Sequence, residues 1–215
     1  MGISPGARSK SRAKKVAAHR RRAVFLDRDG TIIRQVELPR KPSQLRLLAG
    51  AAGAIKRLKK EGYFTAIISN QPVVARGILT PAGVVELNEV LLKRLAARGA
   101  GIDAFYFCPH HPNADVRKYR KTCACRKPNP GMILEAARRH RIDLRKSFFI
   151  GDTTQDVLAG RNAGVKTILV RTGHGGRDPW QYKAKPDFIA KDLPAAARLI
   201  GRLSKGRSSV ISWER

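Results

Sequence analysis

The chain has 215 residues, of which 42% are hydrophobic, and it carries a formal net charge of +28. These values fit a single folded domain with a buried core, and they exclude a fully disordered chain. The sequence has no run of about 18 apolar residues, and no apolar stretch follows its basic N-terminus. We therefore expect neither a membrane span nor a secretory signal, and we assign the protein to the cytoplasm.

The positive charge has no single focus. Residues 1–22 carry eight Lys or Arg and no acidic residue, but the rest of the chain is also strongly basic. Such a charge fits a nucleic-acid partner, a small anionic substrate drawn in by the positive field, or simply a basic surface. We interpret 1–22 as a disordered basic tail, 23–200 as one folded domain and 201–215 as a basic C-terminal extension.

Short apolar runs alternate with amphipathic segments along the predicted domain. In chain order we expect strands at 23–27, 63–70, 103–109, 147–152, 165–170 and 187–190, and helices at 50–61, 81–98, 130–141, 154–163 and from Leu193. This alternation predicts a three-layer α/β fold in which helices cover both faces of a mostly parallel sheet. In such sheets, ligands bind beyond the carboxyl ends of the strands.

The motif FLDRDGT (25–31) ends the first predicted strand with two carboxylates, Asp27 and Asp29, beside a turn at Gly30. Carboxylates held this closely can bind a hard cation such as Mg²⁺. One of them can attack phosphorus while the other transfers a proton. Taken alone, the motif also fits an ordinary Asp-Gly turn after a strand.

Three further polar motifs are weak when each is taken alone. ISN (68–70) offers a hydroxyl and an amide to phosphoryl oxygens, although Ser and Asn often begin loops. RKP offers Lys127 to offset charge on a reacting phosphate. IGDTTQD offers Asp152, which could equally be a helix N-cap, and Asp156 four residues later. Because each set follows a successive buried strand, we expect the acid pair, hydroxyl, lysine and third acid to converge.

As a set, these motifs resemble those of the haloacid dehalogenase superfamily of phosphohydrolases over about residues 23–200. The resemblance implies a Rossmann-like phosphatase domain without a large cap domain. It implies that Asp27 is the nucleophile and Asp29 the general acid and base. It also implies Mg²⁺ bound by the side chains of Asp27 and Asp152 and the backbone carbonyl of Asp29. The remaining implied site residues are Ser69 and Lys127 at the phosphoryl group, with Thr31 and Asp156 in support.

The only three cysteines lie close together in a polar segment that also contains His110 and His111. An odd number of cysteines disfavours a disulfide framework, whereas two pairs of ligands, each spaced i and i+2, can close a tetrahedral site on one Zn²⁺. Four protein ligands leave no open position, so the ion would be structural. We predict a zinc loop at 108–125, with His111 as the alternative histidine and three unligated thiols as the competing interpretation. The predicted ligands are Cys108, His110, Cys123 and Cys125.

This loop and the RKPNPGM that follows it look like those of the D-glycero-D-manno-heptose 1,7-bisphosphate 7-phosphatases, as do the segments SNQ, ARGILT and VRTG. The resemblance implies a monomeric enzyme of heptose biosynthesis that acts on a small phosphorylated sugar. Pro72 and Val73 stand where that family has Ser and Gly, and proline removes a backbone donor from the substrate loop. The implied substrate contacts are Arg126, Asn70, Gln71 and Arg76.

Two related functions remain as alternatives. Histidinol-phosphate phosphatases have a similar but shorter Cys and His loop, so the fifteen-residue step from Cys108 to Cys123 favours the heptose enzyme. The phosphatase domain of polynucleotide kinase phosphatases has a comparable acid pair and an RKP-like segment. Nucleic acid 3′ ends are the less favoured substrate, because aromatic residues for stacking bases make up only 6% of the chain.

Overall fold

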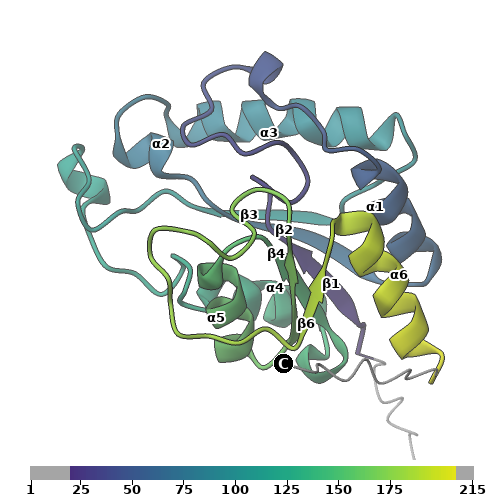
Figure 1. Cartoon of the computed structure of the whole chain (residues 1–215). Coiled ribbons are helices and arrows are strands. Elements are labelled where there is room, and N and C mark those ends of the chain that lie inside the picture. The colour runs from purple at the N-terminus through teal and green to yellow at the C-terminus, as the bar shows by residue number, and fades with distance from the viewer. Residues whose placement is uncertain (1–19, 207–215) are drawn as a thin grey trace, which may run out of the picture.

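The fold is known from a computed structural model, which describes residues 20–206 (Figure 1). Six strands form one sheet in the order β3-β2-β1-β4-β5-β6, and all neighbouring strands are parallel. The strands are β1 (Ala23–Leu26), β2 (Phe64–Asn70), β3 (Ala104–Cys108), β4 (Phe148–Gly151), β5 (Lys166–Val170) and β6 (Phe188–Ala190). The helices are α1 (Ala51–Lys60), α2 (Pro72–Ala75), α3 (Pro81–Ala96), α4 (Gly131–His140), α5 (Thr154–Ala163) and α6 (Leu193–Ser204). The predicted parallel α/β fold is confirmed.

The sheet is the middle of three layers, and its two faces build separate cores. Val24 and Leu26 of β1 point into the core that contains α1, α3 and α6. Ala23 and Phe25, the alternate residues, point into the core that contains α4 and α5. Figure 1 shows α1 and α6 side by side on one face, with α4 and α5 on the other. Because both faces are covered, the central strands are short continuous apolar runs rather than alternating ones.

The strand order places β1 between β2 and β4. Leu26, the last residue of β1, pairs with Ile67 on one side and with Ile150 on the other. The chain builds outward from β1 to the edge strand β3 and then returns to β4 on the opposite side. This reversal is the topological switch point at which such sheets bind ligands. The residue that follows Leu26 therefore lies between the carboxyl ends of β2 and β4.

Three details differ from the sequence prediction. β3 is an edge strand whose residues 104–107 are half-buried, whereas its apolar sequence suggested a fully buried strand. The substrate loop after β2 contains the additional one-turn helix α2, which begins at Pro72, where the fixed φ of proline suits the first turn. Helix α6 continues to Ser204, so the first four residues of the predicted C-terminal extension belong to the fold.

The backbone of the chain is bound to the fold from Arg21 onward. Its backbone N–H donates to the carbonyl of Arg141 at 2.9 Å, and its carbonyl accepts from the N–H of Asp143 at 2.7 Å. The last residues of the predicted N-terminal tail are thus bound to the end of α4. Residues 1–19 of that tail, and 207–215 of the C-terminal extension, lie outside the described residues.

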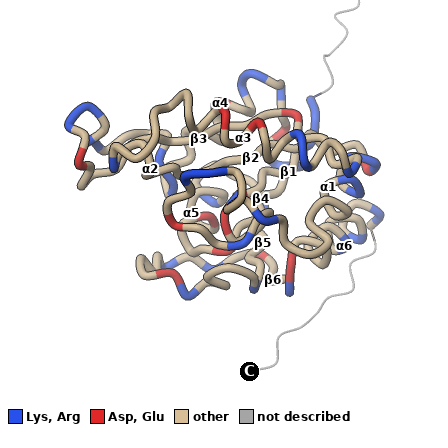
Figure 2. The backbone as a smooth tube through the Cα atoms, turned by 90° about the horizontal axis from the view of Figure 1, so that it is seen from above, with Lys and Arg blue, Asp and Glu red and all other residues tan. Residues whose placement is uncertain are grey.

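Positive charge is spread over the surface of the fold. Figure 2 shows Lys and Arg on segments on every side of the view, with acidic residues between them. This distribution fits the sequence observation that the basic charge has no single focus.

Among the described residues, no helix has the length and apolar character needed to cross a membrane.

Candidate active site and metal centre

The buried Lys127 lies between two carboxylates at the carboxyl end of the sheet. Its Nζ is 2.5 Å from Asp27 Oδ1 and 2.6 Å from Asp156 Oδ1, and it also donates to the carbonyl of Ile68 at 3.1 Å. Asp27 directly follows β1, and its backbone N–H continues the pairing with β4 by donating to Ile150. The three bonds point the ammonium along the end of the sheet and leave Asp27 Oδ2 without a hydrogen-bond partner among the described residues.

Asp156 is held in place by the start of α5. Thr153 is the N-cap of this helix, and its hydroxyl accepts from the backbone N–H of Asp156 at 3.2 Å. The Asp156 carboxylate in turn accepts from the N–H and the hydroxyl of Thr153, which completes a capping box. One carboxylate therefore both caps a helix and pairs with Lys127, so it is a fixed group with little rotational freedom.

Asp29 is oriented by a fully buried arginine. Arg28 Nε and Nη2 donate to the two Asp29 oxygens at 3.0 and 3.1 Å, a fork that restrains the carboxylate plane. Nη1 of the same guanidinium donates to Asn88 of α3 at 3.0 Å, which ties the pair to the helix layer. Burial raises the pKa of Asp29, although Arg28 opposes the shift.

Asp152 directly follows β4, where it faces Asp27. Its Oδ2 accepts from the backbone N–H of His174 at 2.7 Å, and its Oδ1 lies 3.5 Å from the Thr31 hydroxyl. Gly30 and Gly173 both pass so close to this carboxylate that a Cβ would lie 2.3 and 2.1 Å from Asp152 Oδ2. Only glycine fits at these two positions, because both also have positive φ.

The site holds more negative than positive charge. Carboxylate oxygens of Asp27, Asp152 and Asp156 lie within 4.8 Å of one another, and Lys127 is the one cation between them in the described structure. Burial raises the pKa of Asp27 to about 7 against the attraction of Lys127, and burial with the neighbouring carboxylates raises that of Asp152 to about 9. A divalent cation would offset this crowding, and oxygen-only ligands suit Mg²⁺. The residues therefore fit a Mg²⁺ site.

The end of β2 supports this cluster with hydroxyl and amide groups. Asn70 clamps the backbone of Lys127: its Oδ1 accepts from the Lys127 N–H at 3.1 Å, and its Nδ2 donates to the Lys127 carbonyl at 3.2 Å. Gln71 Nε2 donates to the Ser69 hydroxyl at 2.8 Å and to Asp29 at 3.3 Å. The three residues after Ile68 therefore position the groups that face the pocket.

A pocket of about 360 Å³ opens above these carboxylates. Its lining includes cationic and imidazole groups from Arg76, His111 and Arg126 and apolar groups from Val36, Leu38, Pro179 and Trp180. Arg126 is half-buried and forms no ion pair with a carboxylate in the described part of the chain; its Nη1 donates to the carbonyl of His110 at 2.9 Å. Burial lowers the pKa of Arg126. An anionic ligand would pair this guanidinium.

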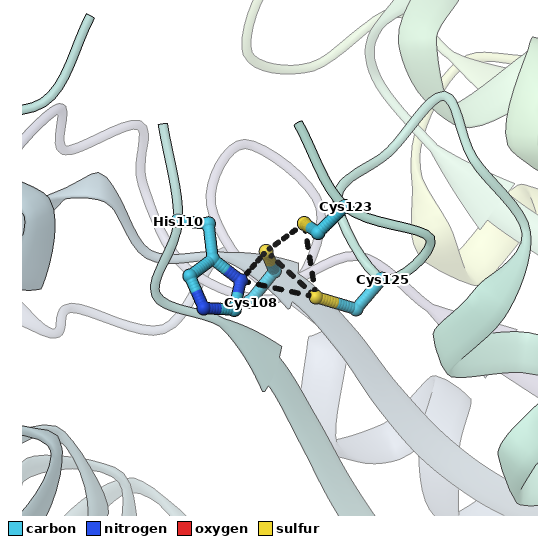
Figure 3. A group of neighbouring side chains, drawn as sticks. All are labelled: Cys108, His110, Cys123 and Cys125. Atoms are coloured by element: carbon cyan, nitrogen blue, oxygen red, sulfur yellow. Dashed lines mark hydrogen bonds between the residues drawn. The ribbon is translucent and has the colours of Figure 1, made fainter. Parts of the chain in front are cut away.

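A second cluster forms at the end of β3 and in the loop that follows it, and it consists of the four residues predicted to bind zinc (Figure 3). The sulfur atoms are 3.1 to 3.5 Å apart, and His110 Nδ1 lies 3.7 Å from Cys108 Sγ and 3.4 Å from Cys125 Sγ. In a tetrahedral Zn²⁺ site with bonds of about 2.3 Å to sulfur, neighbouring ligand atoms are somewhat less than ~4 Å apart. All three cysteines are free. The ligand set and its spacing fit a closed zinc site, with His110 as the histidine in the cluster.

Comparison with known proteins agrees with this geometry. The D-glycero-beta-D-manno-heptose-1,7-bisphosphate 7-phosphatase of Photorhabdus laumondii is 43% identical over 152 residues, which cover 70% of this chain and 81% of that enzyme. The chain belongs to the haloacid dehalogenase family of phosphatases. The D-glycero-D-manno-heptose-1,7-bisphosphate 7-phosphatase of Thermosynechococcus vestitus is 41% identical over 187 residues, 84% of this chain and 95% of that one.

The fold of this phosphatase is shared with a solved relative. The crystal structure of D,D-heptose 1,7-bisphosphate phosphatase from B. bronchiseptica, complexed with magnesium and phosphate, matches with a TM-score of 0.75 at 32% identity. The match covers 85% of this chain and 99% of that one. A HAD-hydrolase-like family model matches residues 124–196, from the zinc cluster to the start of α6. The predicted superfamily is confirmed, and this protein is a phosphatase.

The structure places most of the predicted site residues around one pocket, with two differences. Lys127 does not follow a strand end, because it lies beyond the zinc loop, nineteen residues after Cys108, and directly before α4. Gln71 is buried and does not line the pocket, in contrast to its predicted contact with substrate. It lies behind Ser69 and Asp29, where its amide holds their oxygens. The remaining predicted contacts, Arg126, Asn70 and Arg76, do line the pocket.

The sequence analysis missed several residues that line the pocket of this phosphatase. His111 lies there, with its Nδ1 accepting from the backbone N–H of Asn113 at 3.0 Å. His174 and Trp180 come from the connection between β5 and β6, and Gln35 and Glu37 from the segment after the acid pair. The rule that ligands bind at the carboxyl ends of strands could have found His174 and Trp180, since their loop follows β5.

Proposed function

We propose that this phosphatase removes the 7-phosphate of D-glycero-D-manno-heptose 1,7-bisphosphate through a phosphorylated Asp27. The observation that carries the proposal is the buried cluster of Asp27, Lys127 and Asp156, which faces a pocket also lined by Arg126, a guanidinium that pairs with no carboxylate of residues 20–206. The carboxylates and Lys127 suit a reacting phosphate, and the Arg126 guanidinium suits a second anion. The names of relatives about 40% identical to this chain support the same substrate.

In the first half of the reaction, Asp27 Oδ2 attacks phosphorus and the bond from phosphorus to the sugar oxygen breaks. Asp29, held by the Arg28 fork, donates its proton to the departing oxygen, which leaves as an alcohol. Lys127 stays bound to Asp27 Oδ1 and offsets charge that builds on the phosphoryl oxygens. The Ser69 hydroxyl, fixed by Gln71, donates to one of these oxygens.

In the second half, water attacks phosphorus and Asp29 accepts its proton. The bond between phosphorus and Asp27 breaks, which releases inorganic phosphate and restores the free carboxylate. The side chains of Asp27 and Asp152 with the backbone carbonyl of Asp29 would hold Mg²⁺, and Thr31 and Asp156 would keep these groups in place. When bound, the ion neutralises the crowded carboxylates and the transferring phosphoryl group.

The zinc cluster has a structural role in this proposal. Zn²⁺ on Cys108, His110, Cys123 and Cys125 would close the loop that carries His111. The last of these ligands directly precedes Arg126, so the ion would also fix the position of that residue. Burial raises the pKa of the Cys108 thiol far above its usual value, so a bound cation is needed to hold it as a thiolate.

The free cysteines also fit a reducing compartment, which supports a cytoplasmic location. We infer a monomeric enzyme, by its resemblance to the family.

A comparison of three substrates tests the proposal. Heptose 1,7-bisphosphate, histidinol phosphate and a 3′-phosphorylated oligonucleotide should be hydrolysed with kcat/KM values that favour the first by at least about a hundredfold. Arg126→Gln should reduce the preference for heptose 1,7-bisphosphate over heptose 7-phosphate, because only the bisphosphate carries the second anion. A preference for histidinol phosphate or for the oligonucleotide would overturn the assignment of the substrate while leaving the chemistry intact.

A further inference from the structure

The connection between β5 and β6 brings a tryptophan to the mouth of the pocket. The Trp180 side chain is 51% exposed, the most open of the three exposed large apolar side chains in the described structure. Of these three, only Trp180 lines the pocket. Exposure of so large an apolar surface beside a ligand site is typical of a side chain that a ligand covers.

The first half of this connection is bound to Asp152 and to the backbone of Gly30. The N–H of His174 donates to Asp152 Oδ2 at 2.7 Å, and the N–H of Gly176 donates to the Asp152 carbonyl at 2.8 Å. The Thr172 hydroxyl donates to the carbonyl of Gly30 at 2.6 Å. The loop therefore lies directly against the ends of β1 and β4, and its position relative to the reacting phosphate is set by these bonds.

The residues on either side of Trp180 are bound to the start of α5. Asp178 is fully buried, and its two oxygens accept from the N–H and the hydroxyl of Thr154, both at 2.6 Å. The N–H of Tyr182 donates to the same Thr154 hydroxyl at 2.9 Å. Figure 1 shows the connection passing over α5 before it reaches β6. The backbone around Trp180 is thus held on both sides, while its indole is left open.

The indole and two cationic side chains line the same pocket. Trp180 is joined in this lining by Pro179, and the ring of His174 meets it edge-on with centroids 6.5 Å apart. Arg126 and Arg76 are the cationic side chains. A ligand that fits this lining carries anionic groups and also presents C–H groups to the indole. A phosphorylated sugar ring has this character, since its hydroxyls leave one or both ring faces apolar.

We propose that Trp180 is a specificity-determining residue whose indole face packs against the sugar ring of the substrate while the reacting phosphate lies at Asp27. The inference rests on the proposed function, because it requires a sugar ring in the pocket. Tryptophan supplies a large flat surface with few rotatable bonds, so little side-chain entropy is lost when the ring binds. The role is one of binding and orientation, and it leaves the chemistry to the carboxylates.

Variants at this position test the inference by a selectivity ratio. In Trp180→Ala, the ratio of kcat/KM for heptose 1,7-bisphosphate to that for acetyl phosphate should fall about tenfold, mainly through KM for the sugar. Trp180→Phe, which keeps an aromatic face, should recover most of the ratio. Leu134→Ala is the matched control, because Leu134 is 44% exposed on α4 and does not line the pocket. Its ratio should equal that of the wild type.

The fluorescence of Trp180 gives an independent test, because ligand binding should not change its emission if the residue has only a structural role. The chain has two tryptophans, so Trp213→Phe leaves Trp180 as the single emitter. In a protein that also carries Asp27→Asn to prevent turnover, heptose 1,7-bisphosphate should change the Trp180 emission saturably, whereas inorganic phosphate should not. A wild type that hydrolyses the bisphosphate, with an unchanged ratio in Trp180→Ala, overturns the role of Trp180. A wild type that hydrolyses acetyl phosphate but not the bisphosphate overturns the proposed function, and the inference with it.

Discussion

The catalytic cluster and the zinc cluster both lie at the carboxyl edge of one sheet, yet they are held together by different means. Asp27, Lys127, Asp152 and Asp156 are 6%, 3%, 0% and 2% exposed, and hydrogen bonds to strand ends and helix caps fix each of them. The zinc-cluster atoms contact one another at 3.1 to 3.7 Å, and three of the four residues are half-buried. Their connecting loop contains only a short 3-10 turn, Arg117–Tyr119, and one isolated bridge.

This difference teaches that the fold by itself preorganises the first cluster, whereas we expect the second to depend on a bound metal. Strand register and capping bring the carboxylates together even though their charges repel. The predicted zinc loop is polar, so we expect that burial of its apolar surface alone does not offset the entropy of ordering its backbone. Substitutions in the first cluster should therefore remove activity from a folded protein. Substitutions in the second should disorder a loop and affect activity through it.

The largest effect is expected from Asp27→Asn. Loss of the nucleophile should reduce phosphate release on the order of 10⁴-fold or more. The fold should persist, because Lys127 keeps Asp156 as a partner. Phosphate release measured beside thermal unfolding checks both expectations. Turnover at the wild-type rate in this variant would contradict the proposed chemistry.

Lys127→Met should reduce both activity and stability. Removing the ammonium leaves Asp27 and Asp156 buried without their partner, which is expected to cost about 3–5 kcal/mol in the free energy of unfolding. Lys59→Met is the matched control, since Lys59 pairs with Asp103 at 2.5 Å while 34% exposed. Its cost should stay below about 1 kcal/mol. Equal losses in the two variants, measured by urea unfolding, would argue against a special role for the buried pair.

Cys125→Ser should separate the zinc cluster from the rest of the fold. Metal analysis is expected to find about one zinc per chain in the wild type and almost none in the variant. Amide hydrogen exchange should rise within 109–124 and stay unchanged in β1 and β4, while kcat/KM falls because Arg126 and His111 lose their support. His111→Ala, next to the predicted ligand, should retain its zinc. A fully folded wild type without zinc would defeat the prediction.

The smallest effect concerns the start of β3, the end opposite to the zinc cluster. Burial alone raises the pKa of Asp103, but hydrogen bonds from Lys59 and Thr65 outweigh it and lower the pKa below its ordinary value. Asp103 therefore stabilises the fold above about pH 4, the unfolded pKa, and this contribution is lost as pH falls through the folded pKa. Asp103→Asn should flatten the acid side of the stability curve by less than about 1 kcal/mol. Identical pH dependence in urea unfolding would refute this assignment.

The sequence by itself was sufficient for the parts of this protein that local chemistry determines. Apolar runs alternating with amphipathic segments defined the strands and helices, because burial on both faces imposes that pattern. The spacing of Cys108, His110, Cys123 and Cys125 identified the second cluster, since ligands two residues apart reach one metal whatever the surrounding fold. Asp27 and Asp152 were found because each directly follows a strand.

Only the tertiary structure decided how these groups reach one another. Strand order is set by how the chain crosses over the sheet, so the sequence did not reveal that β1 lies between β2 and β4 or that β3 is an edge. Long connections set the rest. Lys127, which the sequence predicted at this site, reaches Asp27 from beyond the zinc loop and not from a strand end. Gln71 turns inward behind Ser69, and Trp180 reaches the pocket from the loop after β5. A side chain on a loop is placed by the contacts of that loop with other elements, and no local pattern encodes those contacts.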